Sequence, residues 1–161
     1  MLTWRQLSEQ RPDLTEGGRA LLYQWDVGLA FLSTVRKDGG PRVHPMCPCI
    51  SGDGLYAVIE PHGPKRFDLE RDGRYALHCF PPANNEDAFY VTGRVRKVED
   101  SGERAAVRKT FWAERGQDEA PPQAEGQVVF EFLIETCLLT RTTGHGDWNP
   151  QHTIWRDASQ H

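Results

Sequence analysis

The sequence lacks any long apolar run. No stretch approaches the roughly eighteen consecutive apolar residues that a membrane-spanning helix needs. The opening segment, MLTWRQLSEQRPDLTEGG, also lacks the charged-then-apolar order of a signal peptide. We therefore expect a cytoplasmic protein without a membrane partner.

An excess of positive charge is missing as well. The chain carries 19 Lys and Arg residues against 23 Asp and Glu residues, for a net charge of −4. Proteins that bind nucleic acids usually show a basic footprint. We expect no nucleic-acid partner, and any functional basic residue should act locally. The 161 residues, 38% of them hydrophobic and 26% charged, fit one globular domain over residues 1–161.

Paired cysteines and familiar catalytic motifs are also absent. The four cysteines, Cys47, Cys49, Cys79 and Cys137, show no Cys-x-x-Cys spacing, so we expect reduced and partly buried thiols. No Ser/His/Asp order, GxGxxG or HExxH occurs. If the protein is an enzyme, a bound cofactor therefore supplies the chemistry and the protein positions it.

What is present favours a mainly antiparallel β protein with flanking helices. Tight turns such as KDGG and SGDG separate short apolar strands. Six or seven such strands, with helices after the third and the fifth, predict a β-barrel rather than a doubly wound sheet. The expected elements are an N-terminal helix over about 14–26 capped by Thr15, a barrel over about 28–156 with a bulge or close approach at Gly93, a short helix near Pro64 and a helix capped by Ser101 in which Val107 and Phe111 stack.

The second predicted strand, residues 41–50, starts at Pro41 and contains two further prolines. Pro45 and Pro48 would each remove a ladder hydrogen bond, which sheets tolerate at edges and bulges. We interpret the segment as one that bends around something it binds.

The segment HGPKR predicts an anion site. Lys65 and Arg66 fall in the first turn of a helix, where the helix dipole disfavours cations and favours anions. A phosphate between these side chains and the free backbone N–H groups would explain their position. His62 could donate to the same anion. The alternative is that both basic residues are simply solvated at the surface.

The histidines and cysteines do not predict a metal centre. His44 and Met46 share one strand face with Arg42, whereas Cys47 and Cys49 point the other way. This parity argues against a zinc site and leaves His44 facing a polar ligand or accepting a local hydrogen bond.

Two further sets of residues are interpreted from their neighbours. His78 lies between apolar residues and is expected to be a satisfied core residue. Trp148 and Trp155 fall in the tail with His145 and His152, where they form either core and rim packing or a lid over an aromatic cofactor.

Three stretches resemble the pyridoxamine 5′-phosphate oxidase-like family of FMN-binding split β-barrels. GLAFLSTVRKDGGPRVHPM is similar to its first hairpin, LYAVIEPHGPKRFDLERDGRYALHCF to its third strand, basic turn, helix and fourth strand, and FYVTGRVRKVED to its fifth strand. The ending TIWR loosely fits its closing Trp-containing strand and adds Trp155 to the candidate cofactor contacts. The resemblance implies an antiparallel split β-barrel and a homodimer with FMN at two symmetric interface sites.

Carried over by position, Lys65 falls on the phosphate-binding lysine of the family. His44 and Cys49 stand where true oxidases usually place an arginine and a lysine, and Met46, Cys47, Ile59 and Glu60 fall on strand positions that line the cofactor.

The implied function is a flavin-dependent oxidoreductase that moves a hydride between a nicotinamide donor and a small-molecule substrate. The alternatives are a reductase that uses the deazaflavin F420 and a flavin- or haem-binding protein without turnover. The arginine and histidine pattern that holds pyridoxamine phosphate is not visible near the C-terminus, so vitamin B6 oxidation is not predicted.

Overall fold

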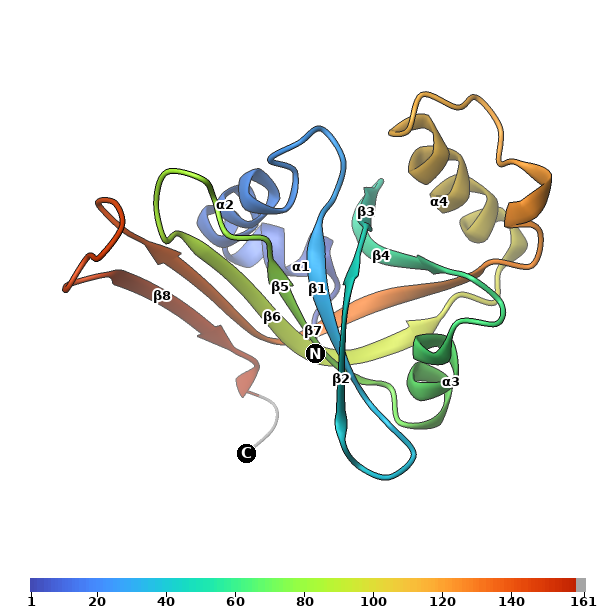
Figure 1. Ribbon diagram of the computed structural model, residues 1–161, viewed down its shortest axis with the longest axis horizontal. Helices are drawn as coiled ribbons and strands as arrows, with labels where there is room; N and C mark the ends of the chain where they lie inside the picture. The colour runs from blue at the N-terminus through green and yellow to red at the C-terminus, as the bar shows by residue number, and fades with distance from the viewer. Residues whose placement is uncertain (159–161) are drawn as a thin grey trace.

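The computed structural model describes residues 1–158, in which eight strands form one antiparallel sheet (Figure 1). The strands are β1 Ala30–Val35, β2 Pro41–Met46, β3 Pro48–Ser51, β4 Gly54–Ile59, β5 Arg74–Cys79, β6 Ala88–Lys97, β7 Val128–Arg141 and β8 Gln151–Arg156. Their order is β2-β1-β5-β6-β7-β4-β3, and β8 pairs with β7 outside this path. The helices are α1 Trp4–Gln10, α2 Pro12–Leu22, α3 Pro64–Arg71, α4 Ser101–Ala113 and a short 3-10 turn, η1, Pro122–Ala124. The predicted split β-barrel with flanking helices is confirmed.

The prediction of one strand over residues 41–50 is wrong, because the chain breaks at Cys47. β2 pairs with β1, whereas β3 pairs with β4 at the other end of the sheet path. Both are therefore edge strands, and Pro48 is the first residue of its strand. Pro45 and Pro48 thus occupy positions where a missing N–H is tolerated. The corner of the split barrel, rather than a ligand, accounts for them.

The N-terminal prediction is corrected as well, since two helices replace one. Thr3 caps α1, because its side chain accepts a hydrogen bond from the Gln6 backbone N–H. The Gln6 side chain in turn accepts a hydrogen bond from the Thr3 backbone N–H, which completes a capping box. Pro12 then starts α2, so Thr15 is buried inside that helix and is not its N-cap. Residues 23–26 follow α2 outside the helix.

Two apolar clusters hold the layers together. The larger joins α1 and α2 to the inner face of the sheet around Phe89, Phe130 and Phe132. The smaller packs α4 on β3, β4 and β7, and Val107 and Phe111 are both buried in it as predicted. Asp100, not Ser101, caps α4, because its side chain accepts from the Glu103 N–H at 2.7 Å.

Gly93 marks the bulge that the sequence predicts. The register between β6 and β7 shifts between Thr92 and Gly93. A Cβ atom on Gly93 would lie 1.9 Å from the carbonyl oxygen of Leu133, so only glycine fits this backbone approach.

The prediction that His78 belongs to the core is wrong. Leu77 and Cys79 point inward, so the period of two turns His78 to the exposed face of β5, where its Nδ1 lies 2.6 Å from the Cys79 carbonyl.

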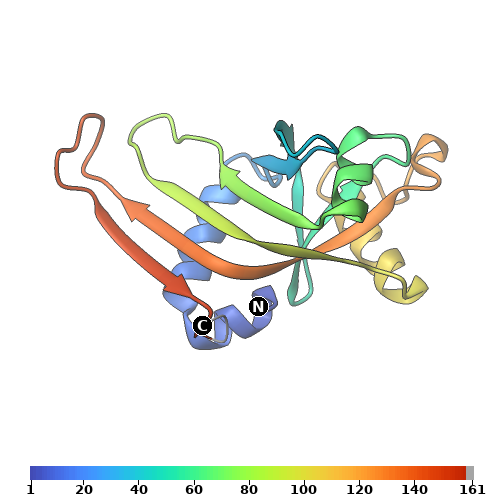
Figure 2. The same ribbon diagram turned by 90° about the horizontal axis from the view of Figure 1, so that it is seen from below.

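Figure 2 shows α1 and α2 against one side of β6 and β7. No helix among residues 1–158 combines the length and hydropathy needed to cross a bilayer.

Candidate functional site

The N-terminus of α3 leaves its first turn without a side-chain cap. Gly63 is the N-cap residue and Pro64 opens the helix, so neither supplies a side-chain acceptor to the first backbone N–H groups. Lys65 follows in the first turn and is half-buried. Its ammonium group makes no hydrogen bond or ion pair with any of residues 1–158. An uncapped helix N-terminus beside an unpaired cation is suited to an anion.

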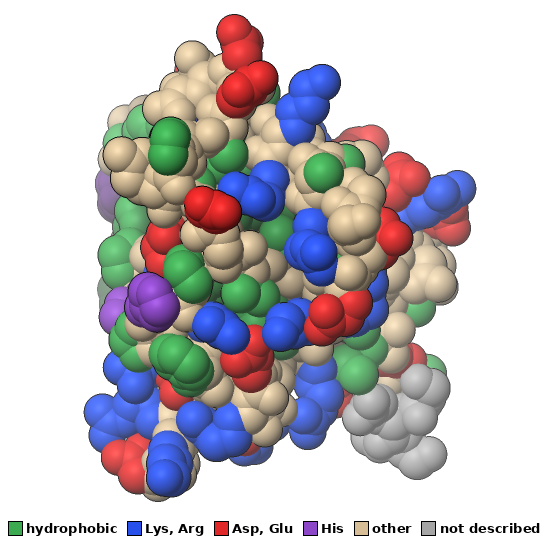
Figure 3. Space-filling view, turned by 90° about the vertical axis from the view of Figure 1, so that its right-hand side faces the viewer, with side chains coloured by type: hydrophobic (Ala, Val, Ile, Leu, Met, Phe, Trp, Pro, Cys, Tyr) green, Lys and Arg blue, Asp and Glu red, His purple; other side chains and the backbone are tan. Residues whose placement is uncertain are grey.

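Arg66, the second basic residue predicted here, is already engaged. Its guanidinium donates to the Pro61 carbonyl at 2.6 Å and pairs with Glu70 at 3.2 Å. It also lies over the Phe67 ring, 5.2 Å from the centroid. Figure 3, which looks onto the end of the molecule that carries α3, shows such basic side chains interspersed with acidic ones. Arg66 therefore shapes the turn, and Lys65 keeps the unpaired charge.

Asp68 fastens α3 to the barrel. Its carboxylate is 3% exposed and accepts from Arg42 of β2 at 2.7 Å, Thr34 of β1 at 2.9 Å and Arg71 at 3.1 Å. Burial disfavours the ionised form, but these hydrogen bonds outweigh it and lower the pKa of Asp68. The anchor fixes α3, which carries Lys65 about one turn before Asp68, relative to β1 and β2.

The sequence alone does not predict the contact between Asp68 and Arg42. The available signal was an acidic residue next to the buried Leu69 in a short helix, together with an inward basic residue, Arg42, on β2. Nothing local showed that the two side chains meet.

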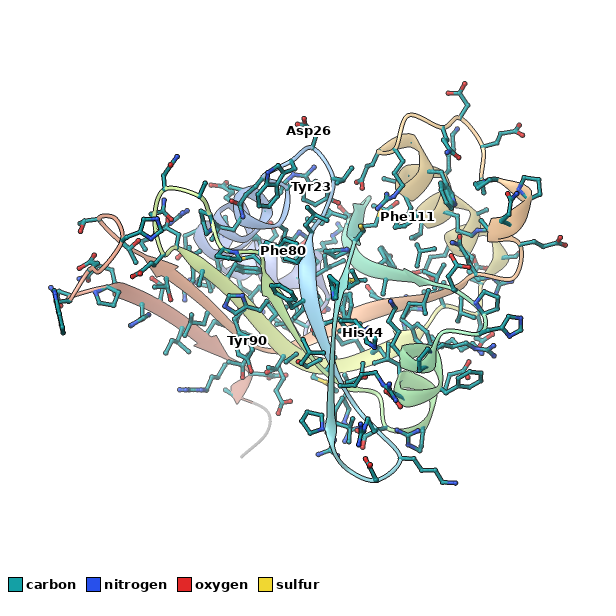
Figure 4. All side chains as sticks on the ribbon, in the orientation of Figure 1. Tyr23, Asp26, His44, Phe80, Tyr90 and Phe111 are labelled. Atoms are coloured by element: carbon teal, nitrogen blue, oxygen red, sulfur yellow. The ribbon has the colours of Figure 1, made fainter. Side chains whose placement is uncertain are left out.

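His44 faces the barrel interior from the centre of β2, where Figure 4 labels it. Its cross-strand partner is Leu32, which is buried, and Met46 follows it on the same face. The Nε2 atom of His44 is buried without a hydrogen-bond partner among the described residues. A buried polar nitrogen without a partner is costly, so this ring is poised for a ligand.

The side chains of Cys47 and Cys49 point away from His44. Cys49 is fully buried in the cluster beneath α4, and Cys47 packs against the same cluster. Burial raises the pKa of the Cys49 thiol to about 12, so it is neutral and cannot replace a cation at the phosphate. All four cysteines are free thiols, and no group of three His, Cys, Asp or Glu side chains within residues 1–158 is arranged to hold a metal ion.

The remaining predicted residues are spread around the barrel. Ile59 is buried in the larger core, and Glu60 accepts from the Gln127 amide at 2.7 Å. His62 is exposed in the turn before α3. Trp155 packs against the larger core from β8, at the far edge of the sheet.

A hollow of about 520 Å³ lies beside α3, between the helix, β6 and β7. Neither Lys65 nor His44 lines it. Its walls are Arg66, Leu69, Glu70, Val95, Lys97 and Phe130. The hollow therefore does not connect Lys65 of α3 with His44 of β2.

No curated protein sequence matches this chain. Solved structures do share its fold. A NimC/NimA family protein from Clostridium acetobutylicum is 15% identical, with a TM-score of 0.61 over 91% of this chain and 98% of that one. A heme binding protein from Mycobacterium smegmatis is 14% identical, with a TM-score of 0.60 over 85% and 57%, and an F420 reductase is 20% identical, with a TM-score of 0.55 over 71% and 91%.

The family model for pyridoxamine 5′-phosphate oxidase matches residues 22–141, most of the chain from the end of α2 to the end of β7. This match spans the split barrel, α3 with its unpaired Lys65, and the broken strand that carries His44. The chain belongs to the pyridoxamine 5′-phosphate oxidase-like family.

Proposed function

We propose that the protein is an FMN-binding oxidoreductase that transfers a hydride between a nicotinamide donor and a small-molecule acceptor. The observation that supports it most directly is Lys65, an unpaired cation at the uncapped first turn of α3. FMN, when bound, supplies the hydride-transfer chemistry, so no acid–base side chain is required. The role of the chain is to hold, orient and shield the cofactor.

Lys65 and the first-turn N–H groups hold the phosphate. Asp68 keeps α3 pressed on β1 and β2, so the phosphate site and the inner face of β2 stay in fixed relation. His44 offers Nε2 to the ring end of the cofactor, and Met46 gives that end an apolar wall.

The protein acts as a homodimer in this proposal. Six side chains, one from each of six paired strands, form a row on the outer face of the sheet. The row crosses five strand spacings of about 4.8 Å, so it is about 24 Å long. Figure 4 labels Tyr90 of this row. Phe31 and Ile154 of this row are exposed apolar side chains, and exposed apolar surface of this kind favours an interface. We name it the outer row: Pro45, Phe31, His78, Tyr90, Leu138 and Ile154, in register from β2 to β8.

Haem binding is the second candidate, because a free imidazole nitrogen is the usual protein ligand of haem iron. The unpaired Nε2 of His44 is the observation that favours it. A fold-level neighbour is a heme binding protein and another is an F420 reductase, so F420 belongs to the same test.

The test is the visible absorption spectrum of the purified protein, followed by titration with FMN, F420 and haemin. FMN should bind, and a nicotinamide donor should bleach its absorption. Lys65→Ala should weaken FMN binding by about 1.5–3 kcal/mol, the usual value of a charged hydrogen bond.

Lys109→Ala is the matched control, since Lys109 is exposed on α4. Equal FMN affinity of the Lys65→Ala and Lys109→Ala variants would remove the phosphate assignment. Tight haemin binding that His44→Ala abolishes, without FMN binding, would select the second candidate.

A further inference from the structure

β2 is an edge strand with one strand partner. It pairs with β1 along its whole length, Pro41–Met46, and ends the sheet path on that side. One side of its backbone therefore faces no other strand among residues 1–158. An exposed edge of this kind is a template for an added strand, which another protein or a second copy of the chain would supply.

The hydrogen-bond pattern shows which residues of β2 face the open side. At the turn before β2, the Arg36 N–H donates to the Gly40 carbonyl at 2.8 Å. Pairs with and without hydrogen bonds alternate along an antiparallel ladder, so the even-numbered residues of β2 bond β1. The odd-numbered residues direct their backbone groups toward the open side: Pro41, Val43 and Pro45.

Two of these three residues cannot donate a hydrogen bond. Proline has no N–H, so Val43 alone offers a donor along the open side of β2. If β2 of two copies paired antiparallel about Val43, three residues in each copy would offer six hydrogen bonds, and the prolines would remove four of them. The rings of Pro41 and Pro45 would also meet the carbonyl groups of the added strand.

The other two edges of the sheet are protected in different ways. β3 has four residues, all of them buried, and α4 packs on it in the smaller apolar cluster. β8, which pairs only with β7 among the described strands, contains no proline, and its exposed residues include Gln151, His152 and Arg156. Short strands, covering helices and charged side chains commonly protect a strand edge. The exposed residues of β2 carry no charge, and Val43 is an apolar side chain that is 59% exposed.

We propose that Pro41 and Pro45 close the β2 edge to strand addition. A partner of this edge, a second copy included, then contacts β2 through side chains, and an extended peptide does not extend the sheet beside His44. The Val43 N–H and the outward carbonyl groups stay accessible to water or to a small ligand. The inference is independent of the proposed function, because it uses only the backbone of β2 and applies equally to a chain without a cofactor.

A double variant, Pro41→Thr with Pro45→Thr, tests the proposal. Threonine restores both N–H groups and favours strand structure. Sedimentation equilibrium compares the mean mass of the double variant with that of the wild type over a series of protein concentrations. The mean mass of the double variant should rise to at least about twice the wild-type value, because each copy gains an edge that pairs with a second copy.

Pro81→Thr is the matched control, since Pro81 is exposed in the loop after β5 and belongs to no strand. This variant should keep the wild-type mass. Circular dichroism checks that both variants retain the strand content of the wild type. A folded double variant that keeps the wild-type mass at every concentration would overturn the proposal.

Amide hydrogen exchange, followed by NMR, tests the same edge in the wild type and needs no variant. The Val43 N–H faces the open side, whereas those of Arg42 and His44 donate to β1. Val43 should therefore exchange at least about tenfold faster than Arg42 and His44. In the double variant at high concentration, Val43 should become protected. Equal protection of Val43, Arg42 and His44 in the wild type would mean that a strand already pairs with this edge, and the proposal would be wrong.

Discussion

Asp68→Asn should destabilise the fold, because it removes the charge that fastens α3 to the barrel. The carboxylate holds Arg42 at 2.7 Å, Thr34 at 2.9 Å and Arg71 at 3.1 Å. Hydrogen bonds to a charged group each contribute about 1.5–3 kcal/mol. The side chains of Arg42 and Arg71 are 28% and 37% exposed, so water recovers part of this loss. We expect about 2–3 kcal/mol in total, or a Tm lower by about 4–12 °C.

Urea unfolding followed by circular dichroism measures this loss. The matched control is Asp53→Asn, whose carboxylate pairs with Arg5 at 3.0 Å where both side chains are more than half exposed. Surface pairs of this kind contribute about 0–1 kcal/mol. If Asp68→Asn and Asp53→Asn shift the midpoint equally, the anchoring role of Asp68 is refuted.

The pH dependence of the same difference has a definite sign. The Asp68 pKa is lowered in the folded protein, so its stabilisation is complete above the unfolded value of about 3.9 and is lost as pH falls through the lower folded value. The difference in unfolding free energy between the wild type and Asp68→Asn should therefore be constant near neutral pH and shrink below about pH 4. A difference that grows in acid would show that another group carries it.

Two further predictions concern the barrel itself. Gly93→Ala should destabilise by about 3 kcal/mol, because the new Cβ would meet the Leu133 carbonyl at 1.9 Å, while Gly102→Ala in the first turn of α4 should be neutral or slightly stabilising; denaturant midpoints compare them. In native protein at pH 8, Ellman's reagent should label Cys47 and leave the buried Cys49 unmodified until unfolding, and fast labelling of Cys49 would contradict its raised pKa of about 12.

Local patterns were sufficient for the elements whose partners are nearby in sequence. The turn residues around β4, the proline at the start of α3 and the glycine in β6 each predict what the structure shows. The break at Cys47 could not be predicted, because it depends on which strand each half pairs with. β2 pairs with the strand before it and β3 with the strand after it, and the sequence between them reads as one continuous run.

In the candidate site, too, the contacts between residues close in sequence could be predicted and the contacts between distant residues could not. The sequence places Lys65 in the first turn of α3. The i,i+4 spacing of Arg66 and Glu70 on that helix is the spacing at which an ion pair forms, and the structure shows this pair. The contact of Asp68 with Arg42 joins residues 26 positions apart and needs the folded barrel. The same is true of Trp155, whose core packing depends on β8 adding to β7 rather than on any local signal.

The broken strand explains why the site would need a second chain. Because the chain leaves one end of the sheet path at Met46 and re-enters at the other end with Pro48, β2 keeps a free edge beside His44. Closing that edge with another strand of the same chain would fill the place where α3 and β2 offer Lys65 and His44. In the proposed homodimer, a two-fold partner would cover that edge instead.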